Sequence, residues 1–420
     1  MLYERWQEVA GECAQQTALH DLAASRRWTF RELARQVEST PRPTDRSRPC
    51  FPTGNGPEFI FSVLNAWRSG QVFCPIEAGQ TPPAIRSPLP AGICMLKTTS
   101  GTTNGPRQVA FTESQVFVDP LNIVTSMGLV RDSPNLGAIS LSHSYGFSNL
   151  VLPLLLHGIP LTLVPNQLPE TIKQAASAGR NWTLPAVPAL WHVWNETSSI
   201  PRNIRLAISA GSPLPLPLEQ AVFVRHGLKI HNFLGSSECG GIAYDASNTP
   251  RTDASCVGSA LHGVGLHLGD NGCLVVSGTQ VGQTYWPEPS DTLGGGIFHS
   301  SDLVEFREGV VFVRGRFGDL INMAGRKLLP ETVERAILLH PSVLECLVLG
   351  LPSADTARGD VVAAVVATRE ATSVEDLRRF LQDYLPDWQI PREWRVVNSL
   401  VASSRGKLSR VEWKHKFNQP

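Results

Sequence analysis

The sequence has no excess of charge of either sign. Its 420 residues include 37 Lys and Arg residues and 37 Asp and Glu residues, so the formal net charge is zero. A protein that binds the phosphate backbone of nucleic acid needs a basic excess, and an acidic disordered tail would show the opposite bias. The charge balance therefore argues against both classes.

Long apolar runs are also missing. The longest, such as residues 150–156, are far shorter than the roughly 20 apolar residues of a membrane-spanning helix. The N-terminal segment MLYERWQE is polar and lacks the apolar core of a secretory signal. Because 42% of the residues are hydrophobic and 18% are charged, we expect a soluble cytoplasmic protein with a large packed core.

The cysteines show no clustering. All eight are scattered along the chain, none belongs to a Cys-x-x-Cys pair, and no His-rich cluster accompanies them. A zinc site or a disulfide framework would need closer spacing. We therefore expect buried free thiols in a reducing compartment.

What the sequence does contain is an alternation of short apolar runs with helical patterns. A helix is expected over residues 26–38, where Thr29 and Glu32 form a candidate capping box, and prolines and glycines between 40 and 56 indicate an irregular connection. Strands are expected at 138–141, 161–164, 206–208 and 228–230. Short buried strands separated by helical stretches are typical of parallel sheet in a layered α/β architecture.

The pattern changes near residue 256. Short strands at 274–276 and 310–313 indicate a smaller, more antiparallel sheet. A helix is then expected from Leu329 with Pro330 in its first turn, followed by strands at 346–349 and 361–366, a helix at 373–384 and a strand at 394–397. We therefore predict an α/β protein with a large N-terminal domain of layered α/β subdomains (1–315) and a small α+β C-terminal domain (316–420).

The sharpest local motif is the polar loop TTSGTTNGPR at residues 98–107. Backbone amides and hydroxyl groups of such a loop can donate to phosphate oxygens, and Gly101 permits a close approach. The Gly-Lys-Ser/Thr of a Walker A loop is missing. Taken alone, this composition is more often a solvated loop.

This loop resembles the phosphate loop of the adenylate-forming superfamily, which reads roughly Thr-Ser-Gly-Thr-Thr-Gly-x-Pro-Lys. The match runs from Thr99 to Thr103 and includes Pro106, whereas Asn104 and Arg107 depart from it. Further segments resemble the family's motifs in the family's order: 141–146, 209–214, 234–238, 300–302, 315–319, 325–334 and 404–410. The sequence is identified as a member of this superfamily, similar to the acyl- and aryl-CoA ligases, with a shortened region before residue 99.

The resemblance implies a reaction in two steps. Mg-ATP and a carboxylic acid give acyl-AMP and pyrophosphate, and a thiol then attacks the acyl-AMP. The implied cofactors are ATP, Mg²⁺ and CoA, or the phosphopantetheine of an acyl or aryl carrier protein in place of CoA. It also implies that the small domain is mobile: its rotation about a hinge at Gly318 swaps Lys407 out of the site and brings the Gly325 region against the pantetheine arm.

The resemblance also assigns roles to single residues. Glu238 would hold Mg²⁺, Asp302 would accept hydrogen bonds from the ribose hydroxyls, and Arg316 would reach the ribose or a phosphate. Lys407 would stabilise the charge that develops between the acid and the α-phosphate. The other nucleotide-binding residues implied by the motifs are Thr99, Ser100, Gly101, Thr102, Thr103, Gly211, Leu234 and Ser237. Outside this context Glu238 is a solvated loop carboxylate, Arg316 a surface ion pair and Lys407 a solvated charge.

The acyl pocket is expected near His143, the third residue implied in catalysis. Its walls are expected from Phe147, Ala210, Gly235 and Gly240, with Pro185 and Val187 nearby. His143 could equally be a hydrogen-bonded core histidine, and the glycines could be turn glycines. The expected pocket is apolar, which suits an aryl or a fatty acid and argues weakly against an amino acid.

Two departures from the family pattern motivate another interpretation. Leu234 stands where the family has an aromatic residue that packs on adenine, and Gly318 replaces the usual Asp or Lys of the hinge. Together with the shortened front end, they are compatible with a non-catalytic module that binds a nucleotide or an acyl group. A phosphotransferase using only the polar loop is a third possibility, although it leaves the Gly-Lys-x-x-Arg tail unexplained. Joint retention of Glu238, Asp302, Arg316 and Lys407 favours the ligase.

Overall fold

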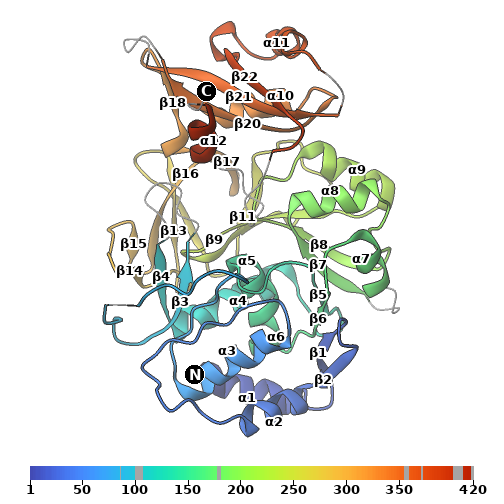
Figure 1. Cartoon of the computed structure of the whole chain (residues 1–420), viewed down its shortest axis with the longest axis vertical. Coiled ribbons are helices and arrows are strands. Elements are labelled where there is room, and N and C mark those ends of the chain that lie inside the picture. Colours follow the sequence, from blue (N-terminus) through green and yellow to red (C-terminus); the bar gives the residue numbers. More distant parts are fainter. Residues whose placement is uncertain are drawn as a thin grey trace. The chain divides into compact units, whose positions relative to one another are not determined.

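The computed structural model describes residues 1–85, 87–99, 107–176, 181–353, 359–369, 372–400 and 410–417. The chain forms two compact units, which can be followed in Figure 1. Unit 1 comprises residues 1–267, 275–299 and 306–311, and unit 2 comprises residues 268–274, 300–305 and 312–420. The domains of residues 1–315 and 316–420 stay a prediction.

The centre of unit 1 is a mainly parallel sheet with the strand order β11-β10-β9-β8-β7-β5-β6-β1-β2. Its strands are β1 (Thr17–Asp21), β2 (Arg26–Thr29), β5 (Asn135–Gly137), β6 (Leu161–Leu163), β7 (Trp182–Ala186), β8 (Ile204–Ser209), β9 (Ile230–Ser236), β10 (Gly240–Tyr244) and β11 (Cys256–Ala260). The pairs from β1–β6 through β8–β9 are parallel, whereas β9–β10 and β10–β11 are antiparallel. The predicted layered α/β class is confirmed.

Helices cover this sheet and fill the space beside it. They are α1 (Leu2–Glu12), α2 (Phe30–Ser39), α3 (Pro57–Ser69), α4 (Glu113–Met127), α5 (Ser144–Gly146), the π-helical turn η1 (Phe147–Val151), α6 (Leu152–His157), α7 (Pro169–Ala175), α8 (Pro188–Glu196) and α9 (Leu216–His226). Trp191 and Trp194 of α8 are fully buried in one core with strand residues such as Leu184 and Ala207. Their rings meet edge to face with centroids 5.4 Å apart. Trp191 Nε1 also donates to the carbonyl of Ile208 in β8 at 3.2 Å, which ties α8 to the sheet.

A small antiparallel sheet beside the main one has the order β14-β4-β3. It consists of β3 (Ile93–Thr98), β4 (Gln108–Thr112) and β14 (Thr284–Trp286). The remaining strands before the tail are β12 (Gly265–Leu268), β13 (Cys273–Ser277), β15 (Leu293–Gly294), β16 (Ile297–Arg307) and β17 (Val310–Arg316). Strands β13 and β17 contain the predicted runs 274–276 and 310–313.

Unit 2 contains a sheet with the order β20-β21-β22. Its elements are η2 (Phe317–Asp319), β18 (Ile321–Met323), β19 (Arg326–Leu328), α10 (Pro330–Ile337), β20 (Val343–Pro352), β21 (Asp360–Thr368), α11 (Val374–Gln382), η4 (Asp387–Gln389), β22 (Glu393–Val397) and α12 (Arg410–Phe417). Alternate strand residues face two cores: Val348 and Val362 meet α10 and α11, whereas Leu349 and Ala363 meet Trp413 of α12. The predicted order of α+β elements in this segment is confirmed.

Three sequence-based boundaries need correction. The helix expected over 26–38 begins only at Phe30, because residues 26–29 form β2, although the predicted capping box of Thr29 and Glu32 is present. The strand expected at 138–141 is wrong, since β5 ends at Gly137. There the amide of Leu141 donates to Asn55 Oδ1 (2.9 Å) instead of joining a strand ladder. The run 228–230 only reaches the start of β9.

All eight cysteines lie in the described part of the chain and are free thiols, as expected. Cys13, Cys74, Cys239, Cys273 and Cys346 are buried. Within the described ranges, no helix combines the length and the apolar character needed to cross a membrane.

Candidate functional site

Several predicted nucleotide and acyl residues of unit 1 lie at the carboxyl edge of the parallel strands. Ala210 and Gly211 follow β8 directly, and Leu234 to Ser236 end β9. His143 lies on the connection that leaves β5. Ligands of open α/β sheets bind outside the carboxyl ends of the strands, so the location suits a substrate site.

The base of the polar loop is closed by a short hairpin. The amide of Thr99 donates to the carbonyl of Arg107 (2.7 Å), and the amide of Arg107 donates to Thr99 Oγ1 (3.2 Å). Strands β3 and β4 continue the pairing, with Thr98 opposite Gln108. Ser100, Gly101, Thr102 and Thr103 lie outside the described residues.

Glu238 lies in the turn between β9 and β10, and its carboxylate is held in place. Ser236 Oγ accepts the backbone amide of Glu238 (3.1 Å), and the Glu238 carbonyl accepts the amide of Gly282 (2.8 Å). Tyr285 Oη donates to Glu238 Oε1 at 3.1 Å. Burial and the neighbouring Glu238 raise the pKa of Tyr285, so the phenol stays protonated and remains a donor.

Tyr285 also connects Glu238 to the polar loop. The guanidinium of Arg107 lies 4.8 Å from the centroid of the Tyr285 ring, a cation–π contact. Tyr285 is brought there by pairing of β14 with β4, where it stands opposite Val109. Sequence reasoning missed this role of Tyr285, and no local motif marks it because the contact depends on the pairing of distant strands.

His143 caps the short helix α5, since its Nδ1 accepts the backbone amide of Tyr145 at 3.3 Å. The next residue, Ser144, donates from Oγ to Oγ of Ser237 at 3.2 Å. The His143 segment therefore meets the turn that contains Ser237 and Glu238. The half-buried imidazole keeps this structural contact whether or not it also touches a substrate.

The residues predicted for the acyl pocket differ in their surroundings. Phe147 is buried and packs against the rings of Phe59 and Phe73 at centroid distances of 6.3 and 5.8 Å. Ala210 is also buried, and Gly235 is exposed. Gly240 has a φ of +64° and faces a carboxylate so closely that a Cβ would lie 2.1 Å from Asp119 Oδ1. Its glycine identity is therefore explained by this close approach.

Unit 2 brings the other two predicted nucleotide residues together. Arg316 Nε donates to Asp302 Oδ1 at 3.1 Å, and Ser300 Oγ accepts the amide of Asp302 at the same distance. The Arg316 side chain is 46% exposed, so its contact with Asp302 also fits the alternative role of a surface ion pair. Lys407 lies outside the described residues.

Arg410, the last residue of the predicted tail motif, lies close to the predicted hinge. Arg410 forms ion pairs with Asp319 (2.7 Å), Glu331 (2.9 Å) and Glu334 (2.7 Å), and its Nε donates to the carbonyl of Val348 (2.9 Å). Burial raises the pKa of Glu334, whereas Arg410 opposes that shift. Asp319 directly follows Gly318 in the chain, so the start of α12 is tied to the segment that contains the hinge residue.

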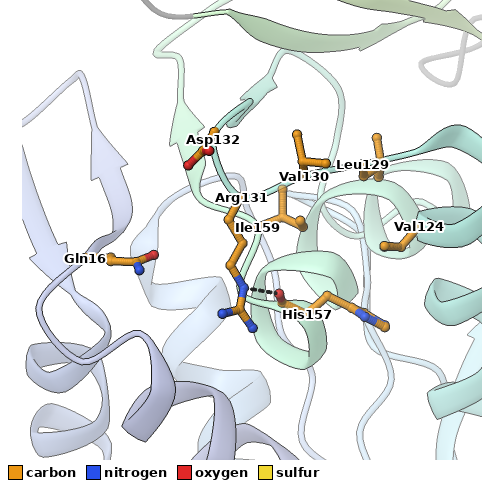
Figure 2. Close-up of a pocket in the computed structure, with 8 residues that line it drawn as sticks. All are labelled: Gln16, Val124, Leu129, Val130, Arg131, Asp132, His157 and Ile159. Atoms are coloured by element: carbon orange, nitrogen blue, oxygen red, sulfur yellow. Dashed lines mark hydrogen bonds between the residues drawn. The ribbon is translucent and has the colours of Figure 1, made fainter.

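A cavity of about 470 Å³ lies elsewhere in unit 1 (Figure 2). It is lined by Gln16, Val124, Leu129, Val130, Arg131, Asp132, His157 and Ile159. Gln16 directly precedes β1, Asp132 lies before β5 and Ile159 lies before β6, so the cavity is at the amino edge of these parallel strands. This is the edge opposite to the one where ligands bind in such sheets, and none of the predicted site residues lines it.

Two family profiles match the chain. The AMP-binding enzyme profile covers residues 86–286, and the profile of the AMP-binding enzyme C-terminal domain covers residues 332–407. The chain belongs to the AMP-binding enzyme family. The sequence-based identification as an adenylate-forming enzyme is thereby confirmed.

Similar members of this family have been named for their reactions. A feruloyl-CoA synthase from Amycolatopsis sp is 26% identical over 372 residues, covering 81% of this chain and 74% of the relative. A 2-succinylbenzoate–CoA ligase from Bacillus cytotoxicus is 27% identical over 334 residues, covering 75% of this chain and 68% of the relative.

Solved structures of AMP-binding enzymes share the fold. ATP-bound MatB from Rhodopseudomonas palustris superposes with a TM-score of 0.86 at 19% identity, covering 100% of this chain and 99% of that one. MenE from Bacillus subtilis, in complex with the acyl-adenylate intermediate OSB-AMP, gives a TM-score of 0.83 at 20% identity, covering 98% and 97%. The roles assigned to single residues stay predictions.

Proposed function

We propose that this AMP-binding enzyme is an acid–thiol ligase. It activates a carboxylic acid with ATP to form acyl-AMP, and it transfers the acyl group to the thiol of CoA. Membership in the family supports this reaction, as do relatives that are named as CoA ligases. A carrier-protein phosphopantetheine is the alternative acceptor.

The observation that carries the proposal is the contact chain between Arg107, Tyr285 and Glu238. It links the base of the polar loop to a fixed carboxylate through a 4.8 Å cation–π contact and a 3.1 Å hydrogen bond. A loop rich in amides and hydroxyl groups suits phosphate oxygens, and a carboxylate beside it suits the cation that accompanies them. A nucleotide triphosphate needs both elements at one place.

The residues present fit Mg²⁺. The Glu238 carboxylate and the hydroxyl of the adjacent Ser237 provide oxygen atoms, which hard cations prefer. Across the described residues, no cluster of three or more His, Cys, Asp or Glu side chains is placed to hold a metal ion. This composition suits Mg²⁺, which usually takes one or two carboxylates and completes its shell with phosphates and water. When bound, the ion neutralises phosphate charge.

In the first step, a carboxylate oxygen of the acid attacks the α-phosphorus of ATP. The new bond joins the acyl oxygen to phosphorus, and the bond to the β-phosphate oxygen breaks, so pyrophosphate leaves. Glu238, oriented by Tyr285, would hold the Mg²⁺ that neutralises the triphosphate, and Asp302 and Arg316 bind the ribose. Lys407 stabilises the negative charge that develops around the α-phosphate.

In the second step, the thiol sulfur attacks the acyl carbon of the adenylate. The carbon–oxygen bond to AMP breaks, the thiol gives up its proton, and the thioester and AMP are released. The domain of residues 316–420 turns about Gly318 between the two steps and moves Lys407 away from the adenylate. Among the described residues, and apart from its two chain neighbours, no residue has an atom within 4 Å of a Cβ built at Gly318, so the hinge position is sterically open.

The test is pyrophosphate release from Mg-ATP across fatty, aryl and hydroxy acids, with and without CoA. We expect release that depends on one class of acid and rises when CoA is added. Acid-dependent release that CoA does not increase would assign the acyl group to a carrier protein. Formation of ADP in place of AMP would contradict the proposal, and so would the absence of both release and nucleotide binding.

A further inference from the structure

A buried carboxylate on α4 has partners on three other segments of unit 1. Asp119 is only 4% exposed, although it lies in the middle of a helix. Ser148 Oγ donates to Asp119 Oδ2 at 2.5 Å, and the amide of Gly241 donates to Oδ1 at 3.0 Å. The ammonium of Lys97 lies 4.0 Å from Oδ2.

These three partners belong to the segments that contain the predicted catalytic residues. Lys97 is on β3, two residues before Thr99. Ser148 is in η1, five residues after His143. Gly241 is in β10, three residues after Glu238. One carboxylate therefore contacts the strand that leads into the polar loop, the segment after His143 and the start of strand β10 after Glu238.

The carboxylate and the turn fit together closely. A Cβ at Gly240 would lie 2.1 Å from Asp119 Oδ1, so only glycine allows the backbone after Glu238 to reach the carboxylate. A small displacement of Asp119 would therefore also displace this backbone or break the hydrogen bond from Gly241.

Lys97 supplies the opposite charge. Its side chain is buried and lies over the ring of Phe111, 4.9 Å from the centroid. Burial lowers the pKa of Lys97, and Asp119 opposes that shift by favouring the ammonium. An unpaired buried charge is costly, so the two side chains depend on each other.

We propose that Asp119, with Lys97 as its counter-ion, is a positioning residue that holds strand β3, the His143 segment and the Glu238 turn in one arrangement. The catalytic part of this proposal rests on the proposed ligase function. Neither side chain touches substrate; both act through the backbone and side chains that they fix. Misplacing a catalytic group by about 1 Å can cost on the order of 10² in rate, so the effect on activity is expected to be large.

The first variant is Asp119→Asn, which keeps the shape of the side chain and removes its charge. We expect acid-dependent ATP–pyrophosphate exchange to fall at least about tenfold, through both a lower kcat and higher KM values for ATP and acid. The double variant Lys97→Met with Asp119→Asn removes both charges and leaves no unpaired ion, so it should fold even if the single variant does not. The exchange rate of the double variant should still fall, because β3 is no longer tied to α4 by an ion pair.

Deuterium uptake provides a readout that does not depend on activity. We expect uptake at residues 93–99, 141–151 and 236–244 to rise together in Asp119→Asn. Val37→Ala is the matched control, because it opens a gap in the core at α2, where Val37 is fully buried, and should leave all three segments and the exchange rate unchanged.

The outcomes separate the two proposals. A wild-type exchange rate in a folded Asp119 variant, or increased uptake confined to α4, would overturn the positioning role. An activity loss that only matches the fraction of unfolded protein would also overturn it. Val37→Ala should show such a loss near its denaturation midpoint. If the wild-type enzyme shows no acid-dependent exchange, the ligase proposal fails, and the uptake of the three segments then decides the role of Asp119 alone.

Discussion

Tyr285 shows how a single side chain can organise a site without belonging to any recognisable motif. Its hydroxyl holds Glu238, and its ring receives Arg107 from the end of the polar loop. Arg107 stands where the family has a lysine, and a planar guanidinium stacks on an aromatic ring better than an ammonium does. The departure from the family pattern at Arg107 therefore has a partner in the structure.

We expect Tyr285→Phe to weaken metal and nucleotide use while leaving the fold intact. A hydrogen bond to a charged group contributes about 1.5–3 kcal/mol, so the Mg²⁺ concentration that half-activates ATP–pyrophosphate exchange should rise about tenfold or more. A magnesium titration of the exchange rate measures this. Tyr244→Phe, at a buried tyrosine of β10, is the control and should leave the titration unchanged.

His157 makes the stability of the protein sensitive to acid. Burial, with Arg5 and Arg131 nearby, lowers the pKa of His157 to about 4. Between pH 6.5 and about 4, His157 binds a proton in the unfolded chain but not in the folded one. The contribution of His157 to the free energy of unfolding therefore falls over this range and is constant below about pH 4. The largest contribution is about 3 kcal/mol.

This prediction is checked by urea unfolding at several pH values. His157→Gln should lose less stability than the wild type between pH 6.5 and 4, because glutamine does not titrate. Parallel curves for the two proteins would contradict the assigned cause.

Among the site residues, those in local motifs could be found from the sequence. Glu238, Ser237 and Thr99 stand in segments that resemble family motifs, so the sequence alone could propose them, and their roles stay predictions. Tyr285 and Asp119 could not be found in this way, since their contacts join segments that are far apart in the sequence and belong to no motif.

Among the helices, α2 tests how well a local signal specifies a boundary. Thr29 Oγ1 accepts the amide of Glu32 (3.2 Å), and Glu32 Oε2 accepts the amide of Thr29 (2.7 Å). Thr29→Ala should lower the free energy of unfolding by about 1 kcal/mol, the usual cost of losing such a cap. Chemical denaturation measures it, and Ser39→Ala at the exposed end of the same helix should change stability far less.

Strand boundaries were harder to predict than helix caps. The run 138–141 is as hydrophobic as a buried strand, but side chains from two other segments form hydrogen bonds with its polar groups. Asn55 takes the amide of Leu141, and the carboxylate of Glu77 accepts the hydroxyl of Ser140 at 3.0 Å. These contacts are tertiary, so hydrophobic pattern alone could not exclude a strand there.

For the chain as a whole, alternation of strands and helices was enough to predict a layered α/β protein. Parallel pairing among β5 to β9 follows because a helix connects each of these strands to the next. The order in which strands lie in the sheet did not follow from the sequence. It places β5 between β6 and β7, and β1 beside β6, through long-range pairings.

The two proposed half-reactions should respond differently to Lys407→Ala. Removing one preorganised charge contact should slow adenylation by about 10²–10³. Thioester formation from supplied acyl-AMP should be spared, because Lys407 is rotated away in that step. Rapid-quench assays of each half-reaction measure this, with Lys414→Ala on the exposed face of α12 as the control. Equal losses in both half-reactions would contradict the alternation of the small domain.

The most direct measurement follows an oxygen atom from the acid into the product. The acid is supplied with ¹⁸O in its carboxylate, together with ATP and CoA, and the released AMP is analysed by mass spectrometry. If the carboxylate attacks the α-phosphorus and the thiol then displaces AMP at the acyl carbon, each AMP carries one ¹⁸O atom. Label in inorganic phosphate with unlabelled nucleotide would instead mean that the acid attacks the γ-phosphate, and it would contradict the adenylation chemistry proposed for this protein.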